Sequence, residues 1–183
     1  MTKKLSEMGL TELWHLFPIQ LVAHQSVWQQ WYQDEATQLK QIIPSSLQIQ
    51  LNHIGSTAIP NIWAKPIIDI LVEMPQSDGL QQIKALLVAK GYLCMAANDQ
   101  RIDLNKGYTT QGFAPRVFHI HLRVLGDHDE IYFRDYLLAH PEIAKAYEQL
   151  KLRLWHDYQF NRDAYTQSKT KFITKYKKLA KAK

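Results

Sequence analysis

The chain of 183 residues contains a single cysteine, Cys94. One thiol excludes a disulfide framework and any metal site built from cysteines, so thiol redox chemistry is not expected. Cys94 follows Tyr92 and Leu93. This apolar context predicts a small buried side chain rather than a nucleophile.

Long apolar runs are also missing from the sequence. No stretch approaches the roughly 20 residues that a membrane-spanning helix needs. The first residues, Met-Thr-Lys-Lys, are not followed by the apolar region of a secretion signal. We therefore expect a cytoplasmic protein that does not contact a membrane. With 46% hydrophobic and 21% charged residues, the chain has the composition of one globular domain spanning residues 1–183.

The sequence has little net charge outside its C-terminal end. The formal charge is +5, and residues 169–183 contain seven lysines and no acidic residue, which leaves the remainder at about −2. Such an ending is typical of a solvated helix face or chain end rather than of a phosphate groove. Nucleic acid is therefore not an expected partner, and no feature of the sequence specifies an oligomeric state.

The N-terminal half has the pattern of a helix followed by two strands. Apolar residues at helical spacing predict an amphipathic helix from Pro18 to Ile43, ended by Pro44. Alternation over 47–51 predicts a strand that passes into a loop at His53. After the polar turn of 55–66, a strongly β-prone run predicts a strand that begins at Ile67.

The middle of the chain predicts one helix and one further strand. Residues 78–90 form a short amphipathic segment between a capping aspartate and a glycine. We expect residues 96–115 to be mostly loop, with a short strand near 101–104. Alternation then predicts a strand over 117–125.

The remaining sequence, from Asp129 onward, is helical in pattern. A second helix is expected to begin at Pro141 and a third after a break at 161–164. The expected fold class is therefore α/β (α+β), with a core over 18–125 that includes the N-terminal helix, and C-terminal helices over 126–183.

Four ionisable residues fall on the polar faces of two predicted strands. Asp69 and Glu73 share one strand face, and His119 and His121 share a face of the later strand. If the two strands lie near one another, these side chains converge beside the turn of Gly55, Ser56 and Thr57. Such a convergence would make a site.

The residue types suggest how that site could act. A carboxylate and neutral imidazoles can bind a divalent cation, while a glycine-containing turn offers N–H groups and hydroxyls to phosphate. Lys65 offers a positive charge that could bind the same phosphate, and Arg134 is a further candidate for anion binding. The alternatives are that Asp69 fixes the loop before it and that the histidines form the solvated side of a strand. The turn lacks the glycine pattern of a P-loop, and Ser56 lacks the elbow motif of a hydrolase nucleophile.

Several blocks of the sequence together resemble the GrpB family. The first two blocks are His53-Ile54-Gly55-Ser56-Thr57-Ala58-Ile59-Pro60 and Ala64-Lys65-Pro66-Ile67-Ile68-Asp69-Ile70. The later ones are Arg101 with Lys106-Gly107, His119-Ile120-His121-Leu122, Phe133-Arg134-Asp135-Tyr136-Leu137, Ala139-His140-Pro141-Glu142, Leu150-Lys151, and Tyr165 with Lys169 and Lys171-Phe172-Ile173. The chain departs from the family pattern at Asn61, where glycine is usual, and around 107–118.

The resemblance implies a nucleotidyltransferase-like mixed sheet flanked by helices. In that fold a Gly-Ser turn binds the triphosphate, and a downstream strand carries an Asp-x-Asp pair for two Mg²⁺ ions. Ser56 and Asp69 match this pattern, but the second acidic position is Leu71. Glu73 on the same strand face is the candidate substitute, and the two histidines stand where the fold places its third carboxylate.

The leading hypothesis is a protein that binds a nucleotide or other phosphorylated small molecule with Mg²⁺ or Mn²⁺ and transfers a nucleotidyl group. In this hypothesis Asp69 and Ser56 are catalytic. The phosphate-binding residues are Gly55, Ser56, Thr57, Lys65 and Arg134, and the metal ligands are Asp69, Glu73, His119 and His121. The alternative is a non-catalytic accessory module, associated with CoA metabolism because GrpB domains occur fused to dephospho-CoA kinases.

Overall fold

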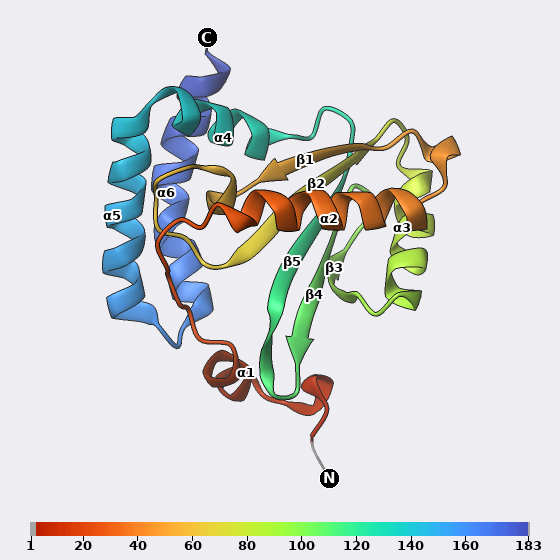
Figure 1. The fold of residues 1–183 in the computed structure, drawn as a ribbon, viewed down its shortest axis with the longest axis horizontal. Coiled ribbons are helices and arrows are strands. Elements are labelled where there is room, and N and C mark those ends of the chain that lie inside the picture. Colours follow the sequence, from red (N-terminus) through yellow and green to blue (C-terminus); the bar gives the residue numbers. More distant parts are fainter. Residues whose placement is uncertain (1–2, 183) are drawn as a thin grey trace.

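A mixed sheet with helices on both faces forms the protein (Figure 1), and the computed structural model describes residues 3–182. The strands are β1 (Gln50–Ile54), β2 (Ile67–Met74), β3 (Leu93–Ala97), β4 (Arg101–Thr109) and β5 (Gly112–Val124), arranged in the order β1-β2-β5-β4-β3. The α-helices are α1 (Leu10–Leu16), α2 (Val27–Ile42), α3 (Asp78–Ala89), α4 (Asp129–Ala139), α5 (Pro141–Tyr158) and α6 (Arg162–Lys181). Short 3-10 turns are η1 (Leu5–Glu7), η2 (Ser45–Leu47) and η3 (Ser56–Ala58). The predicted α/β class is confirmed.

The two faces of the sheet have different partners. Helices α2 and α3 pack on one face, where Trp28 and Leu80 contribute to a core with the buried isoleucines Ile68, Ile70 and Ile120. The opposite face carries Asp69 and the histidines, and it is turned toward α4, α5 and α6. Figure 1 shows α5 and α6 running side by side, with α4 across one end of the pair. The polar face therefore looks onto the C-terminal helices.

The central strands β2 and β5 are parallel neighbours, although most pairs in the sheet are antiparallel. Their register places Asp69 beside His119 and Leu71 beside His121. Because side chains alternate along a strand, this register puts the acid and both histidines on one face. Strand β4 adds Asp103 opposite His121 on that face.

The helix predicted over 18–43 begins later than expected, at Val27. Residues before it are extended, because Val22 forms a β-bridge with Ala64 and the Ile19 amide donates to the Gln159 carbonyl. Apolar spacing in this segment comes from burial of Ile19 and Leu21 and not from a helical face.

The first strand is also displaced from its predicted position. Leu47 belongs to η2, and β1 runs on through His53 to Ile54, where a loop was expected. Pairing with β2 continues to that end, since Ile54 lies opposite Asp69. The strand therefore carries the chain directly into the turn at Gly55.

The expectation of a loop over 96–115 is wrong, because β4 and β5 form a long hairpin there. A bulge between Lys106 and Tyr108 interrupts the alternation that would have marked the strand. Gly107 has a φ of +92° at this bulge, and a Cβ atom on it would lie 2.4 Å from the carbonyl oxygen of Arg116. Cys94 is exposed on the edge strand β3, contrary to the prediction that it is buried.

The starts of the later helices were predicted more accurately than the start of α2. α3 begins at Asp78, α5 begins at Pro141, and Asn161 caps α6 by accepting a hydrogen bond from the Ala164 amide. The starts of α5 and α6 have local causes in the sequence, namely a proline in the first turn and a capping asparagine. The predicted capping role of Asp78 is wrong, because the N-cap of α3 is Ser77 and its side chain forms no capping hydrogen bond. Within residues 3–182, no helix is both long enough and apolar enough to cross a membrane.

Candidate functional site

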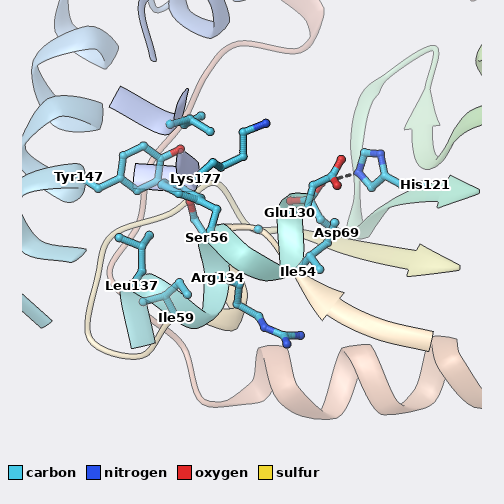
Figure 2. A pocket seen from close by; sticks show the side chains of 13 residues that line it. Ile54, Ser56, Ile59, Asp69, His121, Glu130, Arg134, Leu137, Tyr147 and Lys177 are labelled. Atoms are coloured by element: carbon cyan, nitrogen blue, oxygen red, sulfur yellow. Dashed lines mark hydrogen bonds and ion pairs between the residues drawn. The ribbon is translucent and has the colours of Figure 1, made fainter. Parts of the chain in front are cut away.

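Asp69, His119 and His121 meet on the polar face of the sheet. Oδ1 of Asp69 lies 3.2 Å from Nδ1 of His119 and 3.3 Å from Nε2 of His121. Figure 2 shows the contact with His121 as a dashed line. The three potential ligand atoms all lie within 4.8 Å of one another, a spacing that could hold a metal ion.

The far nitrogen of each histidine ring is held by a protein oxygen. Nδ1 of His121 lies 2.9 Å from Oδ1 of Asp103, and Nε2 of His119 lies 2.8 Å from the hydroxyl of Tyr108. Metal-binding histidines usually have their second nitrogen fixed in this way, because the outer hydrogen bond sets the tautomer and the ring orientation. Sequence reasoning missed both Asp103 and Tyr108.

Electrostatics in this cluster favour a charged pair without metal. Burial alone would lower the pKa of His121, but hydrogen bonds with Asp103 and Asp69 outweigh it and raise the pKa to about 9. Burial would raise the pKa of Asp69, but hydrogen bonds from His119 and His121 hold it far below its ordinary range. Burial lowers the pKa of His119 despite its contact with Asp69. A carboxylate therefore lies between one protonated and one neutral imidazole.

The turn after β1 brings Gly55, Ser56 and Thr57 against this cluster. The Thr57 hydroxyl is buried and donates to the Ile67 carbonyl at 3.2 Å, with Nε2 of His53 at 3.0 Å. This hydroxyl therefore fixes the turn to the start of β2. Ser56 is hydrogen-bonded to Tyr147 of α5 and lines the cavities on both sides of the turn.

On one side of the turn is a cavity of about 290 Å³, here named the cationic cavity. Four basic side chains line it: Lys65, Lys151, Arg162 and Lys169. None of these four forms an ion pair with a carboxylate in the described part of the chain. Nη2 of Arg162 and the hydroxyl of Tyr165, which also lines the cavity, are buried without a hydrogen-bond partner among residues 3–182. Buried polar groups of this kind are rare unless a ligand or water completes them.

Burial and mutual repulsion make the cationic cavity costly to keep charged. Burial, followed by the charges of Lys169 and Arg162, lowers the pKa of Lys65 to about 7. Burial and Lys169 lower the pKa of Lys151 to about 7, and burial lowers that of Lys169 to about 8. An anion in the cavity would relieve this repulsion and restore the protons.

On the other side of the turn is the apolar cavity, of about 320 Å³. Figure 2 shows it with Asp69 and His121 at one side and Tyr147 and Leu137 at the other. Its lining residues are Ile54, Gly55, Ser56, Ile59, Asp69, His121, Glu130, Phe133, Arg134, Leu137, Tyr147, Ile173 and Lys177. The two cavities share Gly55, Ser56, Asp69 and Tyr147. Asp69 therefore lines both the cationic cavity and the apolar cavity.

Glu73 and Arg134 were predicted as site residues, but their side chains bind other groups of the protein. The carboxylate of Glu73 is buried and lies 2.7 Å from Nδ1 of His128, so the structure does not bring it into the cluster around Asp69. Leu71, at the second acidic position of the family pattern, is fully buried. Arg134 lines the apolar cavity, but its guanidinium donates to Asp135 at 2.7 Å and to the His53 carbonyl at 2.9 Å.

The lysine-rich C-terminal end is not the uniformly solvated face that we expected. Lys169 lines the cationic cavity, and Nζ of Lys177 lies 3.3 Å from Oδ2 of Asp129. The sequence contains a signal for the placement of Lys169. Tyr165 and Lys169 follow Arg162 by three and seven residues, a spacing that puts all three on one face of a helix.

Comparison with known proteins identifies relatives of this chain. The model of the family described as GrpB protein matches residues 18–179. UPF0157 protein YqkA of Bacillus subtilis is 32% identical over 178 residues, which cover 94% of this chain and 51% of YqkA. Glutamate-rich protein GrpB of Alkalihalophilus pseudofirmus is 31% identical over 163 residues, or 84% of this chain and 90% of that protein. The chain thus spans about half the length of YqkA.

Solved structures support the same assignment. GrpB from Enterococcus faecalis superposes with a TM-score of 0.75 at 31% identity, covering 88% of this chain and 96% of that one. The Cid1 poly(U) polymerase bound to MgGTP gives a TM-score of 0.52 at 14% identity, over 81% of this chain and 46% of the polymerase. The second likeness shows a nucleotidyltransferase-like fold, as the sequence predicted. From its matched residues and its fold, the chain belongs to the GrpB family.

Proposed function

We propose that this protein binds a nucleotide or another phosphorylated small molecule together with a divalent metal ion. When the ligand is a nucleoside triphosphate, we propose that the protein transfers its nucleotidyl group to an acceptor and releases pyrophosphate. The observation that carries the proposal is the junction at Gly55, Ser56 and Asp69. There a cavity with four basic side chains that form no ion pair among the described residues lies beside a carboxylate–imidazole cluster. The negative charge of a polyphosphate complements the basic side chains of the cationic cavity. A metal ion bound to that polyphosphate could be held by the carboxylate and the imidazoles of the cluster.

The donor atoms around Asp69 discriminate between metals. Two imidazole nitrogens and one carboxylate oxygen are a set that suits Mn²⁺ and other first-row transition ions. Mg²⁺ prefers oxygen ligands, and this cluster supplies one carboxylate only. Of the two ions expected from the sequence, Mn²⁺ is therefore the better fit. Such an ion, when bound, would neutralise charge on the phosphate and on the reacting oxygens.

The protein's own residues have distinct tasks in this proposal. Lys65, Lys151, Arg162 and Lys169 hold the phosphates, and the unsatisfied Nη2 of Arg162 gains a partner. The Gly55–Ser56 turn orients the phosphate nearest Asp69. Asp103 and Tyr108 keep both imidazoles directed at Asp69. CoA and dephospho-CoA belong to the same ligand class, since both carry phosphates on a nucleoside.

The rival function, a non-catalytic accessory module, is favoured by one observation. Leu71 is buried where the nucleotidyltransferase pattern has its second acid, and Glu73 does not replace that acid. A module of this kind would bind the ligand without turning it over. Binding and transfer must therefore be measured separately.

Ligand binding is tested by thermal unfolding with Mn²⁺ or Mg²⁺ and with nucleotides, CoA, dephospho-CoA or tripolyphosphate. A ligand at 100 times its dissociation constant adds about 2.7 kcal/mol to the free energy of unfolding. We expect a Mn²⁺-dependent stabilisation that Asp69→Asn abolishes. The matched control is Asp34→Asn, which alters a surface acid paired with Arg116. An unchanged stabilisation in Asp69→Asn would overturn the metal assignment, and binding without transfer of a labelled nucleotidyl group would favour the accessory module.

A further inference from the structure

The apolar cavity is unsuited to phosphate and suited to an organic group. Its walls include Ile54, Ile59, Phe133, Leu137 and Ile173. A volume of about 320 Å³ falls at the lower end of the range for small-molecule pockets, whose walls are mostly apolar with a few polar groups. A phosphorylated ligand that reaches Asp69 from the cationic cavity could place its organic part here, because Asp69 lines both cavities.

One polar atom in this cavity lacks a partner. Oε2 of Glu130 is buried and accepts no hydrogen bond from any residue that the structure describes. The cationic side chains of the same cavity are engaged elsewhere. Lys177 lies beside Asp129, Arg134 donates to Asp135, and the protonated ring of His121 contacts Asp69 and Asp103. A buried carboxylate oxygen without a donor is destabilising, so a ligand with an N–H group would relieve the cost.

We propose that the apolar cavity binds the nucleobase of a nucleoside triphosphate and that Glu130 selects bases carrying an exocyclic amino group. The inference rests on the proposed function, in which the phosphates occupy the cationic cavity. Adenine and cytosine present an amino donor where hypoxanthine and uracil present a carbonyl oxygen. Glu130 accepts from the amino group, whereas a carbonyl oxygen at that position repels the carboxylate. Sites built around a hydrogen bond discriminate strongly against ligands that lack the matching group.

The test measures dissociation constants by calorimetry in Mn²⁺ for two pairs of ligands, ATP with ITP and CTP with UTP. Tripolyphosphate serves as the reference without a base. We expect the wild-type protein to bind ATP and CTP at least about tenfold more tightly than ITP and UTP. In Glu130→Met, which removes the acceptor at similar side-chain length, the preference should fall to within about twofold. Tripolyphosphate affinity should stay unchanged in this variant, and Glu142→Met, at an exposed glutamate of α5, should behave as wild type.

Each remaining outcome has a defined meaning. Equal affinity for the members of each pair in the wild type, or a preference retained by Glu130→Met, overturns the inference. If tripolyphosphate binds and no base adds affinity, the proposed function survives and the nucleobase site does not. If neither tripolyphosphate nor any triphosphate binds, the proposed function fails and this inference with it. Leu137→Trp, which fills the cavity, gives an independent check, since it should reduce ATP affinity to that of tripolyphosphate.

Discussion

A Cβ atom on Gly55 would lie 2.3 Å from Oδ2 of Asp69, so the turn and the carboxylate occupy adjoining space with no room for a side chain between them. Gly55 also has a φ of +72°, a conformation that other residues adopt at a cost. Two independent constraints thus require glycine here. The backbone of the proposed phosphate-binding turn lies directly on the residue proposed to bind metal.

Gly55→Ala should therefore destroy the site by displacing Asp69. We expect it to reduce Mn²⁺-dependent ligand affinity at least about tenfold, because the carboxylate leaves both histidines. Gly91→Ala is the matched control, since Gly91 has a φ of +89° and nothing within 4 Å of an added Cβ. Gly91→Ala should lose roughly 1 kcal/mol of stability from backbone strain, and Gly55→Ala should lose more because Asp69 must also move, both measured by urea unfolding. Retention of ligand affinity in Gly55→Ala would contradict the placement of Asp69 in the site.

The hydrogen bonds behind the two histidines give a second prediction. Asp103→Asn replaces the carboxylate behind His121 with a weaker, neutral acceptor, and Tyr108→Phe removes the hydroxyl that holds the outer nitrogen of His119. Substitution of such outer partners typically costs about 10- to 100-fold in metal affinity. We expect a loss of that size for Mn²⁺, measured by calorimetry. Asp127→Asn, which alters an ion pair with the half-exposed Arg101, serves as the control and should bind Mn²⁺ like the wild type. Wild-type affinity in both variants would show that the histidines do not bind metal.

Much of the cluster around Asp69 could be predicted because alternation along a strand is a local property. The period of two placed Asp69 and Glu73 on one face, and His119 and His121 on another, without any knowledge of the sheet. Their meeting depends on β2 and β5 being neighbours, which periodicity does not determine. The Glu73 carboxylate is held by His128, which follows β5 and belongs to no periodic pattern in the sequence.

The cationic cavity was harder to predict, because its residues come from separate elements. Lys151 lies on α5 and Lys169 on α6, and only tertiary packing brings them to Lys65. The number of lysines at the C-terminal end predicts only that Lys169 is one lysine of a solvated chain end. Asn61 shows the reverse case, in which a departure from the family pattern changes little. Its φ of +61° is the left-handed conformation that glycine and asparagine both accept.

Lys106 belongs to the family motifs, yet its contacts are structural. Its Nζ lies 2.9 and 2.8 Å from the two carboxylate oxygens of Glu35, a buried residue of α2 that also accepts from the Tyr92 hydroxyl. Removing one partner of such a pair leaves a buried charge without compensation. We expect Lys106→Met to lower the free energy of unfolding by about 3 kcal/mol in urea titrations and to leave ligand affinity unchanged. Lys90→Met, at an exposed lysine, should change stability by less than about 0.5 kcal/mol. A loss of affinity without loss of stability in Lys106→Met would move this residue into the site.

Substitution of Lys169 should have the opposite effects to substitution of Lys106: it should increase stability and weaken ligand binding. Burial lowers its pKa to about 8 from an ordinary 10.5, so the folded protein holds this charge at a cost. Lys169→Met should raise the free energy of unfolding at pH 7 by about 1 kcal/mol, while reducing tripolyphosphate affinity at least about tenfold. Lys171→Met, at an exposed lysine of the same helix, should do neither.

The pH dependence of this gain follows from the direction of the pKa shift. Below about pH 8 the side chain is protonated in both the folded and the unfolded chain, so the cost of the buried charge is fully present. Between pH 8 and 10.5 the folded protein releases the proton while the unfolded chain retains it, and the wild type gains stability. The difference between Lys169→Met and wild type should therefore shrink as the pH rises from 6 toward 10, measured by urea unfolding at each pH. Lys65 and Lys151, whose pKa values of about 7 are lowered in part by Lys169, lose their protons over the lower part of this range and contribute to the change. A difference that does not vary with pH would show that Lys169 is fully solvated, and the cationic cavity would lose one of its four charges.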